Sequence, residues 1–169
     1  MISKIELVEK KHRWLLAQVD VDFPTPESIL GRDLYIEREK STQYRELASL
    51  NTEHQIESVL DEVYLVDFHR LTIMFAQLQS KFWLETKEQN HVLEFFAQIV
   101  LSESHDLYVG FKSTHAIICG IATRSNQELL ISDLISEDAN PIAIDHFINS
   151  IVKRYVKQES ISKVIVPIA

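Results

Sequence analysis

Glycine is scarce in this chain, which holds three, Gly31, Gly110 and Gly120, none of them close to another. A phosphate-binding loop of the Walker or dinucleotide-binding type needs several neighbouring glycines, because its backbone approaches the phosphate closely and adopts positive φ. The sequence therefore excludes those nucleotide-binding loops. A Gly-x-Ser-x-Gly nucleophile elbow is also missing, so a hydrolase triad of that kind has no anchor.

Cysteine occurs once, at Cys119, so an internal disulfide cannot form. Cys119 lies in the apolar stretch "AIICGIA", where we expect a buried and inert thiol, since reactive thiols need exposed, electropositive surroundings. Apolar runs are short throughout, and none approaches the roughly 18 residues that span a membrane. The charged start "MISKIELVEKKHRW" does not resemble a secretory signal. Together these features predict a soluble, cytoplasmic protein.

Positive charge is in deficit, with 17 Lys and Arg against 25 Asp and Glu, giving a formal net charge of −8. Nucleic acids and anionic membranes bind clustered Lys and Arg, so the sequence predicts neither as a partner. A small amine or cationic substrate is favoured instead. The seven histidines include no His-x-x-x-His pair, and Asp67 and His69 are spaced for a strand, although a helix is predicted there. We therefore predict no metal site.

The first half of the chain reads as mainly helical, because neither Gly nor Pro occurs between Arg32 and Val109. Apolar residues at helical spacing over 56–83 predict one long helix or two short ones. A further helix is expected after Asn90, a suitable cap. The aromatic residues Trp14, Phe82, Trp83, Phe95 and Phe96 match these stripes, so we assign them to the core rather than to a ligand site.

The N-terminal 50 residues allow more than one interpretation. Ile5, Val8, Leu15 and Val19 fit a helix, but the stretch "RWLLAQVDVDF" also fits a strand. "PTPES" then breaks the chain. We predict a short strand over 33–39, followed by a helix over 41–51.

The pattern changes after His105, where "DLYVGFK", "HAIICGIATR" and "ELLISDLIS" are rich in β-branched and aromatic residues and separated by turn-like segments. They predict an antiparallel meander of three strands. A helix follows, with Asn140 as its cap and Pro141 at its first position. The stretch "KVIVPIA" ends the chain as a buried strand. We expect one domain over 1–169, mainly helical over 1–104 and mixed over 105–169.

This order resembles the central part of the GNAT N-acetyltransferase superfamily, which has the acyl-CoA N-acyltransferase fold. The likeness is carried by "SESHDLYVGFKSTHAIICGIATRSNQELLISDLIS" followed by "PIAIDHFINSIVKRYV", and it covers about residues 90–169. Residues 33–51 are candidates for the family's first strand and helix. The resemblance implies an α/β (α+β) fold, a GNAT-like mixed sheet with helices on its faces, here with an enlarged helical N-terminal half.

The resemblance also implies a site that binds acetyl-CoA or another acyl-CoA. Leu134, Ile135 and Ser136 would offer strand backbone to the pantetheine arm, and Asn140, Ile142 and Ala143 would face the pyrophosphate. In the family, carboxylates near the third strand take a proton from the attacking amine, which makes Glu128 and Asp133 the catalytic candidates. The alternative, which we favour, places Glu128 in a turn and Asp133 on a solvated face.

Two features depart from the family's pattern. The family has Gln or Arg and then Gly-x-Gly or Gly-x-Ala before the helix, whereas this chain reads "SEDANPIAID", with Glu137 and Asp138 where a phosphate would approach. The family also continues past the last strand with a helix, often carrying a Tyr general acid, and two further strands. The N-terminal helices or a partner chain could take their place.

Two function classes follow from the sequence. The first is an acyl-CoA-dependent N-acyltransferase, an acetyltransferase-like enzyme with a divergent cofactor loop. The second is a non-catalytic GNAT-like binding or regulatory module that acts through protein or small-ligand contacts. We also predict a homo-oligomer such as a homodimer, because the strand that ends at Ala169 would otherwise leave an open sheet edge.

Overall fold

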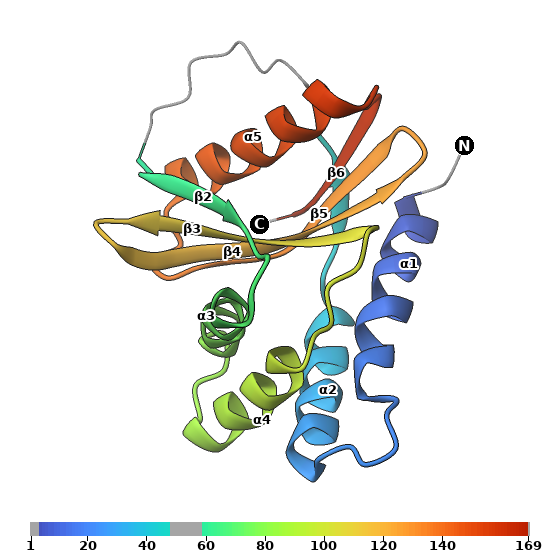
Figure 1. Cartoon of the computed structure of the whole chain (residues 1–169), viewed down its shortest axis with the longest axis vertical. Coiled ribbons are helices and arrows are strands. Elements are labelled where there is room, and N and C mark those ends of the chain that lie inside the picture. The colour runs from blue at the N-terminus through green and yellow to red at the C-terminus, as the bar shows by residue number, and fades with distance from the viewer. Residues whose placement is uncertain (1–3, 48–58, 169) are drawn as a thin grey trace.

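The structure is a computed structural model that describes residues 4–47 and 59–168 (Figure 1). In chain order these ranges form α1 (Lys4–Leu16), the 3-10 turn η1 (Ala17–Val19), α2 (Pro26–Glu39), β1 (Tyr44–Glu46), β2 (Glu62–Leu65), α3 (His69–Ser80), α4 (Thr86–Ala97), β3 (His105–Lys112), β4 (His115–Ser125), β5 (Glu128–Ser136), α5 (Pro141–Gln158) and β6 (Lys163–Pro167).

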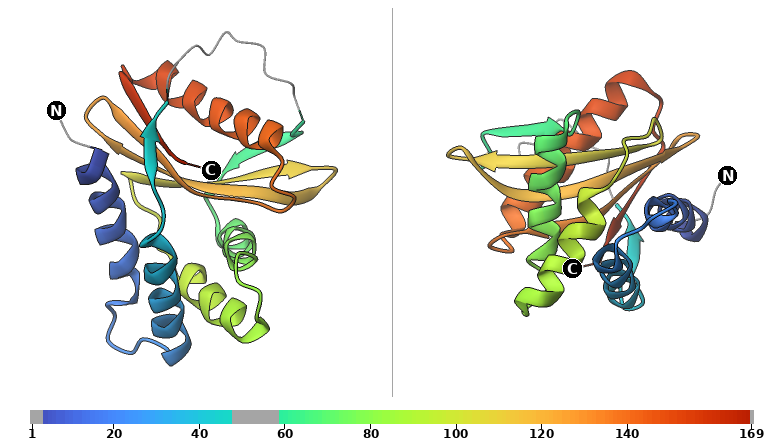
Figure 2. Two further views of the ribbon diagram at one scale, coloured as in Figure 1. Left: turned by 180° about the vertical axis from the view of Figure 1, so that it is seen from behind. Right: turned by 60° about the horizontal axis from the view of Figure 1, so that its bottom comes forward.

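A mixed sheet lies between two layers of helices. This arrangement confirms the predicted α+β class. Among the described residues the sheet has six strands in the order β1-β6-β5-β4-β3-β2. Helices α1 to α4 cover one face and α5 covers the other (Figures 1 and 2). Strands β5 and β6 are parallel, and α5 connects them. The other neighbours in the sheet are antiparallel.

The C-terminal half forms as predicted. Strands β3, β4 and β5 are an antiparallel meander whose ends lie within two residues of the predicted ones. Helix α5 begins at Pro141, and the Asn140 side chain accepts a hydrogen bond from the Ile142 N–H at 3.0 Å. The predicted final strand is β6, whose residues Val164, Ile165 and Val166 are buried.

The N-terminal predictions are partly wrong. Residues 4–16 form a helix, the first of the two alternatives for that segment, but Asp33–Glu39 belongs to α2 rather than to a strand. Thr25 caps α2 by accepting from the Ser28 N–H at 3.2 Å, and Pro26 occupies the first turn, so "PTPES" starts a helix instead of breaking the chain. In the segment predicted as a helix over 41–51, Tyr44–Glu46 forms strand β1 and residues 48–51 lie outside the described residues.

Strand β1 explains the second of these errors. It pairs antiparallel with β6, Tyr44 opposite Pro167 and Glu46 opposite Ile165. This is a long-range partnership, which overrides local propensity and cannot be read from the segment itself. It also covers the edge of β6 with the chain's own N-terminal part. The open edge that motivated the predicted homo-oligomer is therefore absent from the described residues, and the oligomer stays a prediction without that reason.

The helical interpretation of 56–83 is also partly wrong. Residues 69–80 form α3, but Glu62–Leu65 is strand β2, paired antiparallel with β3, and residues 56–58 lie outside the described residues. Val63 is buried between exposed Glu62 and Tyr64, which is the alternation of an edge strand. Helix α4 begins at Thr86, so Asn90 lies inside it and does not cap it.

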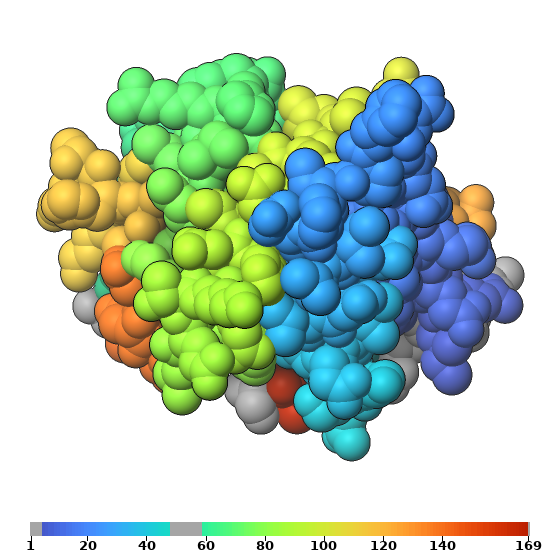
Figure 3. Space-filling model, turned by 90° about the horizontal axis from the view of Figure 1, so that it is seen from below, coloured from blue at the N-terminus to red at the C-terminus, as the bar shows by residue number. Residues whose placement is uncertain are grey.

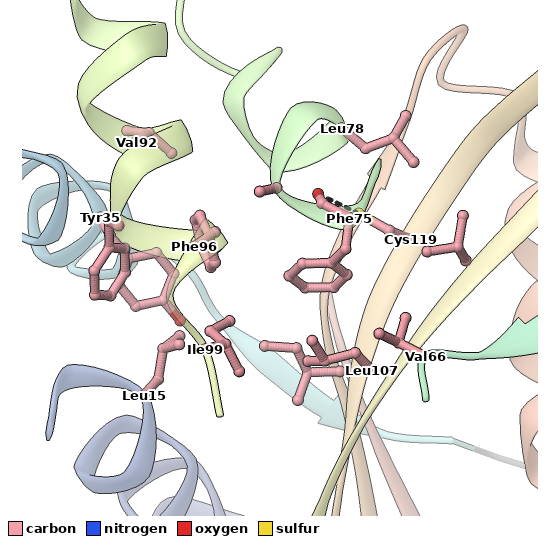
Figure 4. Close-up of a cluster of buried hydrophobic side chains, with 14 of the residues drawn as sticks. Leu15, Tyr35, Val66, Phe75, Leu78, Val92, Phe96, Ile99, Leu107 and Cys119 are labelled. Atoms are coloured by element: carbon pink, nitrogen blue, oxygen red, sulfur yellow. Dashed lines mark hydrogen bonds between the residues drawn. The ribbon is translucent and has the colours of Figure 1, made fainter. Parts of the chain in front are cut away.

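The core lies on both faces of the sheet. On the side of α1 to α4, Tyr35, Phe75 and Phe96 pack with Leu107 and Cys119 (Figure 4). On the other side α5 packs through an apolar stripe that includes Phe147, Ile151 and Val152. In the described part of the chain, no helix is long and apolar enough to cross a membrane.

The aromatic and cysteine assignments can be checked in this core. Trp83, Phe95 and Phe96 are buried as predicted, whereas the Phe82 side chain is 52% exposed, so its assignment to the core is wrong. Trp14 is half-buried and stacks on His105. Cys119 is buried as predicted, and burial raises the pKa of its thiol to about 12. The thiol is therefore protonated at neutral pH.

Candidate functional site

Asp133 lies at an irregular point of β5. Across the ladder Cys119 faces Ile135 and Ile121 faces Ser132, so Asp133 and Leu134 together lie opposite Gly120. Two residues facing one make a β-bulge, and Asp133 adopts a φ of 55° there. A positive φ is uncommon for a residue other than glycine, although Asp tolerates it better than most. The bulge turns the Asp133 carboxylate toward helices α1 and α2.

The Asp133 carboxylate is enclosed by donors. Oδ1 accepts hydrogen bonds from the Tyr35 hydroxyl at 2.8 Å and from the Arg38 guanidinium at 2.7 Å. Oδ2 accepts from the Ser132 hydroxyl at 2.7 Å and lies 3.0 Å from Lys11 Nζ. The side chains of Asp133 and Lys11 are both 0% exposed. The prediction of a solvated Asp133 is therefore wrong, because the bulge turns the carboxylate into the interior.

A second carboxylate, Glu39, shares these donors. Its Oε1 atom accepts from Lys11 at 2.6 Å and from the Tyr44 hydroxyl at 3.0 Å. The same atom lies 3.1 Å from the Tyr35 hydroxyl oxygen, whose proton goes to the closer Asp133, and 3.1 Å from His12 Nε2. Burial alone would raise the pKa of the Glu39 carboxyl. The His12 hydrogen bond and the charge of Lys11 outweigh burial and hold that pKa well below its ordinary value. Glu39 is therefore ionised at neutral pH.

We call Lys11, Tyr35, Arg38, Glu39, Tyr44, Ser132 and Asp133 the Asp133 cluster. It joins α1, α2, β1 and β5, and it balances two buried cations against two buried carboxylates. Arg38 also lies over the rings of Tyr35, Phe82 and Trp83, at 4.8, 5.4 and 5.4 Å. Burial raises the pKa of the Tyr35 hydroxyl far above its ordinary value, so Tyr35 acts as a neutral donor. Chemically, the cluster resembles a satisfied ion-pair network more than a poised base.

Glu128, the other catalytic candidate, lies at the opposite end of β5. It is the first residue of the strand and is buried, so its placement in a turn is wrong. Its Oε1 atom lies 3.8 Å from Lys163 Nζ, and within the described residues its buried Oε2 atom has no hydrogen-bond partner. Asp133 lies five positions further along the strand, about 16 Å away at the usual rise. The structure does not bring the two carboxylates together.

The predicted pantetheine-binding residues are Leu134, which is part of the bulge, and Ile135 and Ser136, which follow it; all three are half-buried. One edge of this stretch pairs with β4, since Ile135 faces Cys119 and Ser136 faces Ile118. The pairing between β5 and β6 covers Glu128, Leu129 and Leu130, and β6 then continues alongside β1. Strands β5 and β6 therefore separate after Leu130, beside the predicted pantetheine-binding residues.

The predicted pyrophosphate site at the start of α5 is occupied by the chain's own groups. The Ile142 N–H donates to Asn140, and Ala143 is buried. Asp138 Oδ1 accepts from the Ser136 hydroxyl at 3.1 Å and from the Asn140 N–H at 3.2 Å. Glu137 forms an ion pair with Lys81 at 2.7 Å. These contacts satisfy the positive end of the helix dipole without a ligand.

Two cavities lie beside the Asp133 cluster, and both are lined by His12 and Glu39. The larger, of about 460 Å³, lies between α1, β1 and the end of the chain, with Val8, Tyr44 and Ile168 in its wall. The smaller, of about 220 Å³, lies between α1 and α2, with Tyr35 in its wall. Helices α1 and α2 lie side by side on the face shown in Figure 3.

Comparison with known proteins does not assign the chain to a family. No protein-family model matches the chain, and no curated protein matches it. Within 4–47 and 59–168, no group of three or more His, Cys, Asp and Glu side chains is placed to hold a metal ion.

Sequence reasoning missed most of the Asp133 cluster, but part of it left a signal. Lys11 lies at helical spacing between Leu7 and Leu15, so a charge interrupts the buried stripe of α1. A charged residue on an apolar stripe indicates a buried partner. Tyr35 and Glu39 are spaced to share one face of a helix, but that signal was hidden because a strand was predicted there.

Proposed function

We propose that the protein is a GNAT-like module that binds a partner or small ligand and does not transfer acyl groups. The observation that carries this proposal is the enclosure of Asp133. A general base must reach the proton that it removes, directly or through one water. Both oxygens of this carboxylate are already engaged, by Tyr35 and Arg38 on one side and Lys11 and Ser132 on the other.

The order of the elements supports the GNAT-like part of the proposal. The likeness stated from the sequence asks for a helix, three antiparallel strands, a helix and a strand, and α4, β3, β4, β5, α5 and β6 follow that order. The N-terminal segment provides a helix layer and strand β1 at the edge of the sheet beside β6.

The start of α5 supports the loss of acyl transfer. An acyl-CoA pyrophosphate needs free N–H groups and positive charge. At this helix start the Ile142 N–H donates to Asn140, Asp138 brings negative charge, and the positive charge of Lys81 is already paired with Glu137.

An acyl-CoA-dependent N-acyltransferase is the second candidate, and one observation favours it. Strands β5 and β6 separate after Leu130, beside Leu134, Ile135 and Ser136. Strand backbone at such a separation could hold the pantetheine arm of acetyl-CoA or another acyl-CoA. This candidate requires Asp133 or Glu128 to be released from its present partners.

The double substitution Glu137→Gln/Asp138→Asn tests the site at α5. We expect acetyl-CoA to bind the wild type weakly and the double variant up to about fivefold more tightly, because exposed charges contribute about 1 kcal/mol or less. Isothermal titration calorimetry with acetyl-CoA measures both affinities. Asn at 138 keeps the oxygen that accepts from Ser136 and Asn140, so the loop is retained.

The matched control is Asp22→Asn/Glu27→Gln, which removes the same net charge at exposed positions near the start of α2. It should leave acetyl-CoA binding unchanged. Tight binding by the wild type, weakened by the Glu137→Gln/Asp138→Asn variant, would contradict the proposal and favour the enzyme.

A further inference from the structure

The two cavities that share His12 and Glu39 in their walls form what we call the α1 cleft. Its larger part has apolar walls from Ile5, Val8 and Ile168 and a polar wall that includes Glu9 and Tyr44. Apolar walls with a few placed polar groups are the usual composition of a small-molecule site. Helix α1, helix α2 and strand β1 build the cleft, so it lies outside the predicted acyl-CoA site on β5 and α5.

The charged group of the cleft is Glu39. Its side chain is 7% exposed, yet it lines both cavities, so its carboxylate is the buried anion that a ligand in either cavity would meet. Tyr35 borders the smaller cavity and Tyr44 the larger. On the cleft side, the carboxylate is paired with His12, whose side chain is 28% exposed.

The chain itself provides an example of what this setting binds. The Lys11 ammonium lies 2.6 Å from Glu39 Oε1, and 5.4 and 6.0 Å from the ring centres of Tyr35 and Tyr44. An alkylammonium ion that meets both a carboxylate and the rings of two tyrosines gains a charge-assisted hydrogen bond and cation–π attraction. Lys11 also contacts Asp133 of β5 and does not line either cavity, whereas Glu39 lines both.

We propose that the α1 cleft binds a primary amine with a short apolar tail, whose ammonium group replaces His12 as a partner of Glu39. The tail lies between Val8 and Ile168, and Glu9 stands at the exposed rim. The net charge of −8 attracts such a cation and repels a carboxylate of the same shape. This inference rests on the proposed function. It names the ligand of the binding module, an amine that the protein binds without acylating it.

Hexylamine, hexanol and hexanoate share one tail and differ in charge, so they test the proposal directly. Calorimetric titration of the full chain at neutral pH should show hexylamine binding at least about tenfold more tightly than hexanol or hexanoate, as a charge-assisted bond requires. Glu39→Gln should weaken hexylamine binding by about tenfold, with folding of the variant checked by circular dichroism.

Because Glu39 also holds the buried Lys11, a second variant is needed that leaves the Asp133 cluster intact. Glu9→Gln changes an exposed residue of the rim and should weaken hexylamine binding about two- to threefold. The control is Glu37→Gln, an exposed residue of α2 paired with Lys40, which should leave the affinity unchanged.

The amine site is refuted if hexylamine does not bind the wild type, if hexanol binds equally well, or if Glu9→Gln leaves the affinity unaltered. These results leave the proposed function standing. Conversely, N-acetylhexylamine formed when acetyl-CoA is added would contradict the absence of acyl transfer, and the Glu9→Gln titration would still decide whether the cleft holds the amine.

Discussion

Replacing Asp133 by Asn should lower the free energy of unfolding by about 3–5 kcal/mol. The substitution keeps the size of the side chain but leaves Glu39 as the one carboxylate of the Asp133 cluster opposite Lys11 and Arg38, both of which have side chains less than a tenth exposed. A buried cation that loses its counter-charge is strongly destabilising. Urea denaturation of the wild type and the variant, followed by circular dichroism, measures the difference.

A double-mutant cycle separates the ion pair from simple packing. Lys11→Met should also lower the free energy of unfolding strongly. The double variant Lys11→Met/Asp133→Asn should lose less than the sum of the two single losses, because each substitution removes the charge that the other leaves without a partner. The control is Glu37→Gln, which breaks the exposed pair with Lys40 and should cost less than about 1 kcal/mol. Additive losses in the cycle would show that Lys11 and Asp133 do not depend on one another.

Replacing Gly31 by Ala should be the second most damaging change, at about 3 kcal/mol. Gly31 lies in the middle of α2, where glycine normally weakens a helix. A Cβ atom there would lie 2.0 Å from the His91 carbonyl oxygen and 2.9 Å from Phe95 Cβ, both on α4. Since backbone cannot move aside like a flexible side chain, α2 and α4 would have to separate. Thermal and urea denaturation measure the loss.

Asp33→Ala is the matched control for Gly31→Ala, because it introduces the same residue on an exposed position of the same helix. It should change the stability by about 0.5 kcal/mol or less. A Gly31→Ala variant as stable as the wild type, as the higher helix propensity of Ala alone would suggest, would refute the tight contact between α2 and α4.

The predictable parts of the fold are those whose signals are local. The meander of β3, β4 and β5 follows from short β-rich runs separated by turns, and α5 follows from the Asn140 cap and Pro141. The strands β1 and β2 were missed because each is defined by a distant partner, β6 for Tyr44–Glu46 and β3 for Glu62–Leu65. Helix α2 was missed in part because the short stretch "DLYIERE" also fits a strand.

The site was harder to predict than the fold. Asp133 was identified as a candidate, but its surroundings depend on a bulge and on partners far away in sequence, such as Tyr35, which is 98 positions away. A sequence pattern cannot show that a residue in a strand adopts a positive φ and turns inward. Lys11 was the signal that could have been used, since a lysine on the buried stripe of a helix requires a counter-charge.

Incubation of the wild type with acetyl-CoA and hexylamine, analysed by mass spectrometry, tests the central claim most directly. If the Asp133 carboxylate is held by its four donors, N-acetylhexylamine should form at the same rate with and without the protein. Protein-dependent formation of N-acetylhexylamine and coenzyme A in equal amounts would contradict the claim and establish the chain as an N-acyltransferase.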